Sequence, residues 1–206
     1  MFYNILDKKR ENILPFLKSL KQDFYLAGGT ALALQLGHRD SVDFDFFSEK
    51  DIDTKKLFEK VKVIFTGKKI VKIQDEINTL TVLIDENIKI SFFGYQYPLL
   101  EKLIDEPNLK LASTLDIATM KLVAITSRAS NKDYIDLYYI LENIDLNDLL
   151  EKASKKFPEI DRNLILKSLV YFEDIEIEPI LFKNNKEINF EKIKDFLKDE
   201  VLKLKI

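Results

Sequence analysis

Two aspartates, Asp43 and Asp45, stand two positions apart in a segment that otherwise consists of valine and phenylalanine. The alternation predicts a strand over residues 41–47. The apolar residues expected to face the core are Val42, Phe44 and Phe46. Because residues i and i+2 of a strand face the same side, the two carboxylates should lie next to each other. Carboxylates in an apolar strand are costly unless something pairs with them, so a cation is the expected partner.

The composition restricts which cation this can be. The chain has no cysteine and one histidine among 206 residues, which excludes thiolate sites and multi-histidine zinc catalysis. A metal must then be held by carboxylates, which indicates Mg²⁺ or Mn²⁺. Asp43 and Asp45 are the predicted ligands, at a spacing that suits the metal ions of phosphoryl-transfer sites.

Two glycines, Gly28 and Gly29, follow a short apolar strand expected at residues 24–27. Thr30 is the predicted N-cap of a helix over residues 31–36. The free N–H groups and positive dipole end of such a helix suit a phosphate, and glycine allows close approach of the backbone. A phosphate cradle followed by two carboxylates outlines a nucleotide and metal site.

Each feature alone also has a purely structural explanation. A pair of glycines is most often a turn, and a D-x-D pattern is most often the solvated edge of a strand. The two features together, at this spacing and with apolar residues at alternate positions, favour the nucleotide site.

The overall composition is that of a globular chain, with 46% hydrophobic and 33% charged residues. A general DNA-coating protein would be basic, whereas the net charge here is −3; a local lysine patch could still bind RNA. Residues 1–16 carry charges where a signal peptide has its apolar segment. No apolar run approaches the roughly 20 residues that span a bilayer. We therefore expect a cytoplasmic protein without membrane partners.

The pattern predicts a mixed α/β unit over residues 1–97 and a helical unit over residues 98–206, packed as one rigid body. Further strands are expected at 69–74, 79–85 and 88–95, with weak β signal around 175–182. Helices are expected at 3–21, where Pro15 interrupts the pattern, and at 52–66, 99–104, 113–129, 132–144, 146–156, 160–172 and 190–204. The last of these is amphipathic, which indicates a surface helix rather than an RNA binder.

The stretch GGTALALQLGHRDSVDFDFF resembles the first motif of the nucleotidyltransferase-like AbiEii/AbiGii toxin family, part of the DNA polymerase β-like nucleotidyltransferase superfamily. The positions that match the motif are Gly28, Gly29, Asp43, Phe44 and Asp45. The residues His38, Arg39 and Ser41 between them are also similar to the family pattern. The resemblance implies an α/β (α+β) nucleotidyltransferase fold. Such a fold has a mixed β-sheet with flanking helices, followed here by a mostly helical C-terminal half.

A second stretch, STLDIATMKLVAITSRASNKDYIDLYYIL at residues 113–141, is similar to later motifs of the same family. The matching positions are Asp116, Lys121, Arg128, Lys132, Asp133 and Asp136. Lys121 and Arg128 would share a helix face and could reach one anionic ligand. Asp133 or Asp136 would orient Lys121 or the acceptor. The structural alternative is an exposed helix whose charges pair with one another.

One position departs from the family pattern. Enzymes of the superfamily add a third carboxylate from a later strand, and the equivalent position in IKISFFGY is Ser91. Serine is a poor metal ligand, and it is no base at about pH 7. The third acid could instead be Asp85, or Asp133 from the helical half, which we favour. Otherwise the protein works with two acids or with weakened activity, and Ser91 is simply a strand hydroxyl.

Two weaker candidates remain. His38 follows a helix end and is expected to cap or pack rather than to act in catalysis. The aromatic residues Phe92, Phe93, Tyr95 and Tyr97 are expected to pack in the core and hairpin, with base stacking as the alternative.

The resemblance implies a Mg²⁺-dependent nucleotidyltransferase toxin that moves a nucleoside monophosphate from an NTP to an acceptor and inhibits growth. The implied catalytic residues are Asp43, Asp45, Lys121 and Asp133. The implied nucleotide-binding residues are Gly28, Gly29, Thr30, Lys121, Arg128 and Asp136. Some family members modify the 3′ end of tRNA, so tRNA is the first expected acceptor. The expected partner is a separately encoded antitoxin, which in this family often acts without a stable complex.

Two other functions stay open at this point. The protein could transfer the nucleotide to a small molecule or to a protein hydroxyl. It could also be a catalytically weakened nucleotide-binding module, because Ser91 stands where a third carboxylate is expected.

Overall fold

The computed structural model describes residues 1–204 and contains a seven-stranded sheet. The strands are β1 (Tyr25–Ala27), β2 (Phe44–Ser48), β3 (Ile70–Glu76), β4 (Thr79–Ile84), β5 (Ile88–Gly94), β6 (Ile104–Asp105) and β7 (Lys110–Leu111). Their order is β3-β4-β5-β2-β1-β7-β6. The pairs β2–β5 and β1–β7 are parallel, and the other neighbours are antiparallel. The predicted mixed sheet is therefore confirmed.

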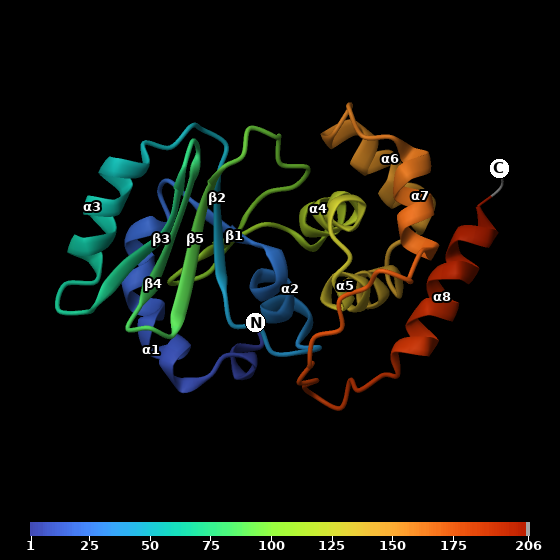
Figure 1. Ribbon diagram of the computed structural model, residues 1–206, viewed down its shortest axis with the longest axis horizontal. Helices are drawn as coiled ribbons and strands as arrows, with labels where there is room; N and C mark the ends of the chain where they lie inside the picture. The colour runs from blue at the N-terminus through green and yellow to red at the C-terminus, as the bar shows by residue number, and fades with distance from the viewer. Residues whose placement is uncertain (205–206) are drawn as a thin grey trace.

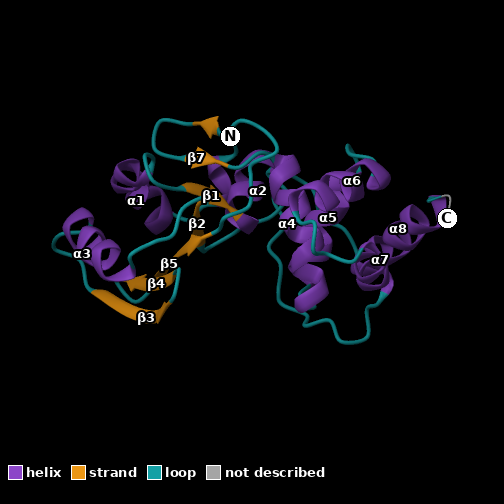
Figure 2. Cartoon of the chain, turned by 90° about the horizontal axis from the view of Figure 1, so that it is seen from above, coloured by secondary structure: helices purple, strands orange, loops and turns teal. Residues whose placement is uncertain are grey.

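Helices flank the sheet and make up most of the second half of the chain (Figure 1). The α-helices are α1 (Lys8–Leu17), α2 (Gly28–Leu36), α3 (Thr54–Ile64), α4 (Thr114–Ser127), α5 (Asn131–Leu141), α6 (Leu146–Lys156), α7 (Arg162–Val170) and α8 (Phe190–Lys203). Figure 2 shows α1 and α3 on one side of the sheet and α2 on the other, where α2 packs against α4 and α5. Across residues 1–204, no helix is both long and apolar enough to cross a membrane.

The core of the sheet follows the predicted alternation. On β2 and β5 the residues Phe44, Phe46, Ile90 and Phe92 are all buried, and the rings of Phe46 and Phe92 stack with their centroids 5.6 Å apart. The intervening residues of both strands therefore face the opposite side of the sheet, toward the helical half.

Strand β2 begins later than predicted, and the prediction that Val42 faces the core is wrong. Val42 is 43% exposed. Its carbonyl accepts a hydrogen bond from the Arg10 guanidinium, and the carbonyl of Asp43 accepts one from the Thr30 hydroxyl. Because side chains rather than a neighbouring strand bind these carbonyls, regular pairing starts only at Phe44.

Helix α2 begins at Gly28, so the prediction that Thr30 is its N-cap is wrong. Gly28 has φ +69°, a conformation that glycine adopts without steric cost, and it turns the chain from β1 directly into the helix. Thr30 lies inside the first turn and is buried. Gly37, with φ +65°, ends the helix.

The N-terminal helix is shorter than the predicted range of 3–21. Asp7 caps α1, because its carboxylate accepts a hydrogen bond from the backbone N–H of Arg10. The helix then runs through Pro15 to Leu17. Short 3₁₀ turns stand on both sides, η1 (Tyr3–Ile5) and η2 (Lys18–Leu20).

The predicted helix at 99–104 is absent, and this segment is irregular, with bends at Leu100 and Glu101. The backbone N–H groups of Leu100 and Glu101 donate to the buried carboxylate of Asp116 on α4. Strand β6 follows at once and pairs with β7, which adds to the edge of β1. The proposed division at residue 97 stays a prediction, and two short strands beyond it extend the same sheet.

Residues 171–189, which we call the strap, connect α7 to α8 and run back across the molecule to the end of α2 (Figure 1). The strap makes isolated β-bridges from Glu176 to Ser130 and from Phe182 to Arg39. The weak β signal predicted around 175–182 corresponds to these bridges. The strap therefore ties the C-terminal helices to the loop that leads into β2.

Candidate active site

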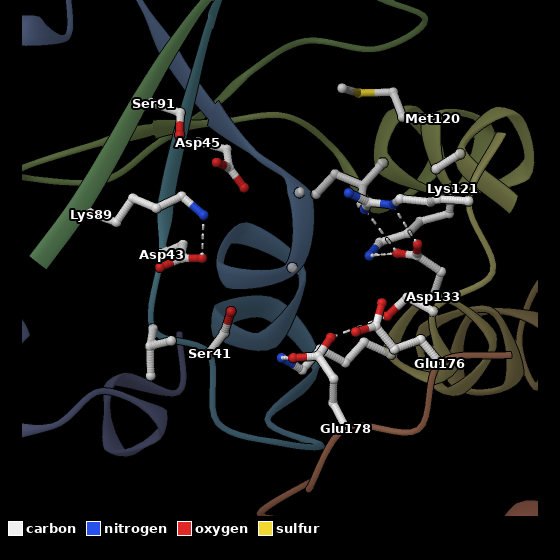
Figure 3. A pocket seen from close by; sticks show the side chains of 18 of the residues that line it. Ser41, Asp43, Asp45, Lys89, Ser91, Met120, Lys121, Asp133, Glu176 and Glu178 are labelled. Carbon is white, nitrogen blue, oxygen red and sulfur yellow. Dashed lines mark hydrogen bonds and ion pairs between the residues drawn. The ribbon is translucent and has the colours of Figure 1, made fainter. Parts of the chain in front are cut away.

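A cleft of about 1130 Å³ lies between helices α4 and α5 and the face of the sheet that points toward the helical half. The lining residues used below come from four places: the α2 start (Gly28, Gly29), the β2–β5 face (Asp43, Asp45, Lys89, Ser91), helix α4 with the start of α5 (Lys121, Arg128, Asp133), and the strap (Glu176, Glu178). Figure 3 shows carboxylates on the sheet side facing cationic side chains on the helical side.

The sheet wall carries the two predicted metal ligands. Asp45 lies within β2, opposite Ala27 of β1 and Ser91 of β5, and Asp43 immediately precedes the strand. Burial and the negative charge of Asp43 raise the pKa of Asp45, while Lys89 and a hydrogen bond from Ser91 partly oppose this rise. Two neighbouring carboxylates therefore line the cleft on this wall.

Lys89 is a residue of this wall that sequence reasoning missed. Its Nζ lies 2.9 Å from Oδ2 of Asp43, and Figure 3 shows it on the same side of the sheet as Ser91. Strand alternation was the available signal, because Lys89 is two positions before Ser91 and must share its face. The parallel pairing of β5 with β2, which brings this face to Asp43, could not be read from the spacing.

The start of α2 forms the floor of the cleft between the two walls. A Cβ on Gly28 would lie 3.0 Å from Oδ2 of Asp45, and one on Gly29 would lie 2.7 Å from a guanidinium nitrogen of Arg39. Thr30 is buried beneath, where its hydroxyl contacts Ser41 at 2.7 Å and the carbonyl of Asp43. The two glycines therefore face the cleft, whereas Thr30 supports the loop that carries Asp43.

The opposite wall is an ion-pair network on α4 and α5. Lys121 Nζ lies 2.5 Å from Asp133 Oδ1 and 2.6 Å from Asp136 Oδ2. Arg128 Nε lies 2.9 Å from Asp133 Oδ2, and its side chain is 65% exposed. Lys121 and Arg128 thus contact the same carboxylate, although Arg128 follows the end of α4 and does not lie on its face, and Lys121 is nearly enclosed.

Asp136 lies behind this wall and does not line the cleft. It is fully buried and accepts two hydrogen bonds from Arg39, each 2.8 Å long, and it contacts His38 Nε2 at 2.7 Å. Burial alone would raise the pKa of Asp136, but the charges of Arg39 and Lys121 hold it well below its usual range. Asp136 therefore fixes the position of Lys121 and Arg39 from inside the protein.

His38 belongs to this buried network, which agrees with the packing role expected for it. The ring is fully buried and packs against Tyr139, with the centroids 5.0 Å apart. Burial lowers the pKa of His38, although Asp136 opposes this effect. The ring does not line the cleft, and its polar partner is Asp136.

The proposed sources of a third acid lie in different places. Asp85 lies in the turn after β4, bound to the backbone of Lys69 and the side chain of Lys68, outside the cleft. Asp133 lines the cleft, but on the helical wall and paired with two cations. Asp116 of the second motif is buried elsewhere, in an ion pair with Lys156.

Two glutamates of the strap also line the cleft, and no sequence signal indicated them. Glu178 pairs with Lys132 at 2.7 Å. The side-chain amide of Asn131 donates a hydrogen bond to the carbonyl of Glu178 and accepts one from its backbone N–H. Glu176 lies beside it (Figure 3). Only the return of the strap across α5 brings these residues to the site.

The aromatic residues divide between two environments. Phe92 is in the core, while Phe93 stacks on Phe47 with a centroid distance of 5.0 Å, and both of these rings line the cleft. Tyr95 and Tyr97 pack against Phe157 at the end of α6. All four predicted rings therefore pack against other aromatic rings, and Phe93 is the one of the four that also lines the cleft.

The donor set of the sheet wall fits a hard divalent cation. Within residues 1–204 there is no group of three or more His, Cys, Asp or Glu side chains placed to hold a metal. Asp43 and Asp45 nevertheless offer carboxylate oxygens, which Mg²⁺ prefers, and it is usually bound by one or two protein carboxylates together with substrate phosphates. Burial and the nearby charge of Asp43 both raise the pKa of Asp45, so a cation between the two carboxylates would be favourable.

Comparisons with known proteins agree in sequence and in structure. The model of the nucleotidyl transferase AbiEii toxin family, of type IV toxin–antitoxin systems, matches residues 16–203. A protein of Aquifex aeolicus (strain VF5), aq_aa25, is 39% identical over 208 residues, which cover 94% of this chain and 98% of that protein.

Among solved structures, MenT4, a nucleotidyltransferase toxin of Mycobacterium tuberculosis H37Rv, has a TM-score of 0.63 at 17% identity, covering 96% of this chain and 83% of its own. JHP933 from Helicobacter pylori has a TM-score of 0.58 at 18% identity, covering 95% of this chain and 88% of its own. These two structures confirm the predicted fold.

Proposed function

The chain belongs to the nucleotidyl transferase AbiEii toxin family, and from this membership we propose that it transfers a nucleoside monophosphate from an NTP to the 3′ end of tRNA. The enzyme class, nucleotidyltransferase, is that of the family. The Mg²⁺ requirement, the tRNA acceptor and the inhibition of growth are the proposed parts.

One observation carries the proposal: the carboxylates of Asp43 and Asp45 face the cationic wall across a single cleft, with the start of α2 between them. An NTP has a polyanionic chain that needs cations and N–H donors along its length. Cationic side chains line this cleft, and so does the start of α2, whose first N–H groups have no partner within the helix.

Asp43 and Asp45 would hold Mg²⁺, which neutralises charge on the transferred phosphoryl group and on the pyrophosphate. A cation at this position would also offset the repulsion between the two carboxylates. The loop carrying Asp43 is held by the Thr30 hydroxyl, so the pair is positioned before a ligand arrives.

On the helical wall, Arg128 would bind the phosphates directly because its guanidinium is the more exposed cation. Lys121 would act from behind it as a fixed point charge. Asp133 positions both side chains, and Asp136 holds Lys121 from the buried side. Asp133 is thereby a positioning residue in this proposal.

The choice of tRNA rests on the family resemblance. A small molecule or a protein hydroxyl is the alternative acceptor, and the same cleft would serve either. As a member of a type IV toxin–antitoxin family, the protein is expected to be controlled by a cognate antitoxin encoded separately, in the cytoplasm.

The test is to incubate the protein with each α-labelled NTP, Mg²⁺ and total cellular RNA. We expect label in the tRNA band, and we expect Asp45→Asn to reduce it by at least about 100-fold because a charge-stabilising ligand is lost. The matched control is Asp195→Asn, which removes an exposed carboxylate on α8 and should leave labelling unchanged.

If the label enters a protein or a small molecule and none enters tRNA, the tRNA acceptor is refuted, while the proposed nucleotide transfer stands. NTP binding without pyrophosphate release under any acceptor would favour a nucleotide-binding module, for which Ser91 beside Asp45 is the structural reason. Undiminished labelling by Asp45→Asn would refute the metal-site assignment.

A further inference from the structure

Lys89 projects from β5 into the space beside the two carboxylates of the sheet wall (Figure 3). Its Nζ lies 2.9 Å from Oδ2 of Asp43, with side-chain exposures of 43% and 40% for the lysine and the aspartate. Throughout residues 1–204, no other lysine or arginine lies within ion-pair distance of Asp43 or Asp45. The ammonium is therefore the local counter-charge of the sheet wall.

The position that could add a third negative charge to this wall is neutral. Ser91 pairs in register with Asp45 and is buried. Along β5 the face toward the cleft thus presents an ammonium at Lys89 and a hydroxyl at Ser91. The whole wall offers two carboxylates and one fixed positive charge.

This charge balance differs from that of a site for two divalent cations. Two such ions about 3.5–4 Å apart repel each other strongly and need several anionic ligands to bind together. With two carboxylates, of which one already has an ammonium partner, the wall has too little negative charge for two divalent ions. The negative charge of the wall is enough for one divalent ion.

We propose that Lys89 is the built-in counter-cation of Asp43, so that this site takes one divalent cation instead of two. The proposal rests on the proposed function, because it assumes that Asp43 and Asp45 are the metal ligands. A tethered ammonium cannot dissociate, and it keeps Asp43 neutralised when no metal is bound. A divalent ion must bind against the charge of Lys89, which lowers its affinity.

The test is a titration of the metal-free protein with Mn²⁺ alone, in which free Mn²⁺ is measured by electron paramagnetic resonance. An Asp43→Asn/Asp45→Asn variant provides the background from other surface carboxylates. Above that background we expect wild type to bind one Mn²⁺. Lys89→Gln should bind it about tenfold more tightly, which corresponds to about 1.4 kcal/mol.

Two variants serve as controls. Lys89→Arg keeps the charge and should behave as wild type. Lys72→Gln removes a lysine of β3 that also pairs with an aspartate, Asp75, at 2.5 Å, and should not change Mn²⁺ binding because this pair is outside the cleft.

Two Mn²⁺ ions bound to wild type above background would overturn the proposal, and so would equal affinities of wild type and Lys89→Gln. If that equality occurs while the double aspartate variant loses binding, the carboxylate site stands and only the counter-cation role fails. Equal Mn²⁺ binding by wild type and the double variant would instead overturn both assignments. No outcome depends on the acceptor, because nucleotide transfer is not measured.

Discussion

At the scale of a single residue, Asp45 shows that the site disfavours the charged form of one of its own carboxylates. Asp45 lies on β2 between β1 and β5, and its side chain faces the cleft. Burial and the neighbouring carboxylate of Asp43 raise its pKa. Asp136 shows the opposite case. Its pKa is lowered because cations surround it. Burial and a neighbouring like charge thus raise one pKa, whereas paired cations lower the other.

We expect Asp45→Asn to stabilise the metal-free protein near neutral pH. A carboxyl with a raised folded-state pKa destabilises the fold above that pKa, and the cost disappears below the unfolded-state pKa near 3.8. In EDTA at pH 7 we expect the Tm to rise by roughly 2–4 °C, the size of a 1 kcal/mol effect in a domain of this length. The gain should shrink as the pH falls toward 3.8. Thermal melts across this range measure it, and a lower Tm at pH 7 would contradict it.

At the scale of an element, the start of α2 decides how close a ligand and Asp45 can come to the backbone. Gly28 combines two demands in one residue. Its φ of +69° turns the strand into the helix, and its missing Cβ leaves room for the Asp45 carboxylate at 3.0 Å. Neither demand could be met by a residue with a side chain without strain.

We expect Gly28→Ala to lower the free energy of unfolding by about 1–2 kcal/mol, because an L residue is strained at positive φ. It should also reduce nucleotide transfer by about tenfold, the effect of a 1.4 kcal/mol loss, because the new methyl displaces Asp45. Chemical denaturation and the labelling assay measure the two effects.

Gly67 offers a matched control for this substitution. It has φ +84°, and a Cβ there meets no atom within 4 Å. Gly67→Ala should therefore show a similar loss of stability with full transfer activity. Equal activity losses in both variants would mean that the effect comes from stability and not from the position of Asp45.

At the scale of the whole molecule, the strap joins elements that are far apart in the chain. Asn131 at the start of α5 holds it through two hydrogen bonds to the backbone of Glu178. Further along, Asn184 donates to the carbonyl of Gly37, and Asp40 N–H donates to the carbonyl of Leu181. The strap thus closes one side of the cleft and links the two halves.

We expect Asn131→Ala to detach the strap locally. Loss of the buried amide leaves backbone groups of Glu178 unpaired, which should cost about 1–3 kcal/mol of stability. Trypsin should then cut faster at Lys183 and Lys186, which lie within the strap. Asn163→Ala, an exposed change on α7, is the control. Unchanged cleavage in Asn131→Ala would show that the strap is held by its other contacts.

The sequence by itself determined the features that depend on neighbours along the chain. Alternation placed Asp45 opposite to the core residues of β2, and apolar periodicity located all the helices of the C-terminal half from α4 onward, within a few residues. The two motif blocks identified the family, because each is a local pattern of residue types. Helix and strand periodicity are short-range properties, which is why they can be read without a structure.

Only the tertiary structure decided which of these residues meet. The pairing of β5 with β2 brings Lys89 to Asp43, 46 residues apart in the chain, and the strap brings Glu178 to Lys132 across 46 residues. The burial of Asp136 against His38 and Arg39 likewise joins positions 98 and 97 residues apart. The segment at 99–104 is not helical, because a carboxylate on α4 binds its backbone instead. Such contacts depend on how distant elements pack, and no local spacing encodes that packing.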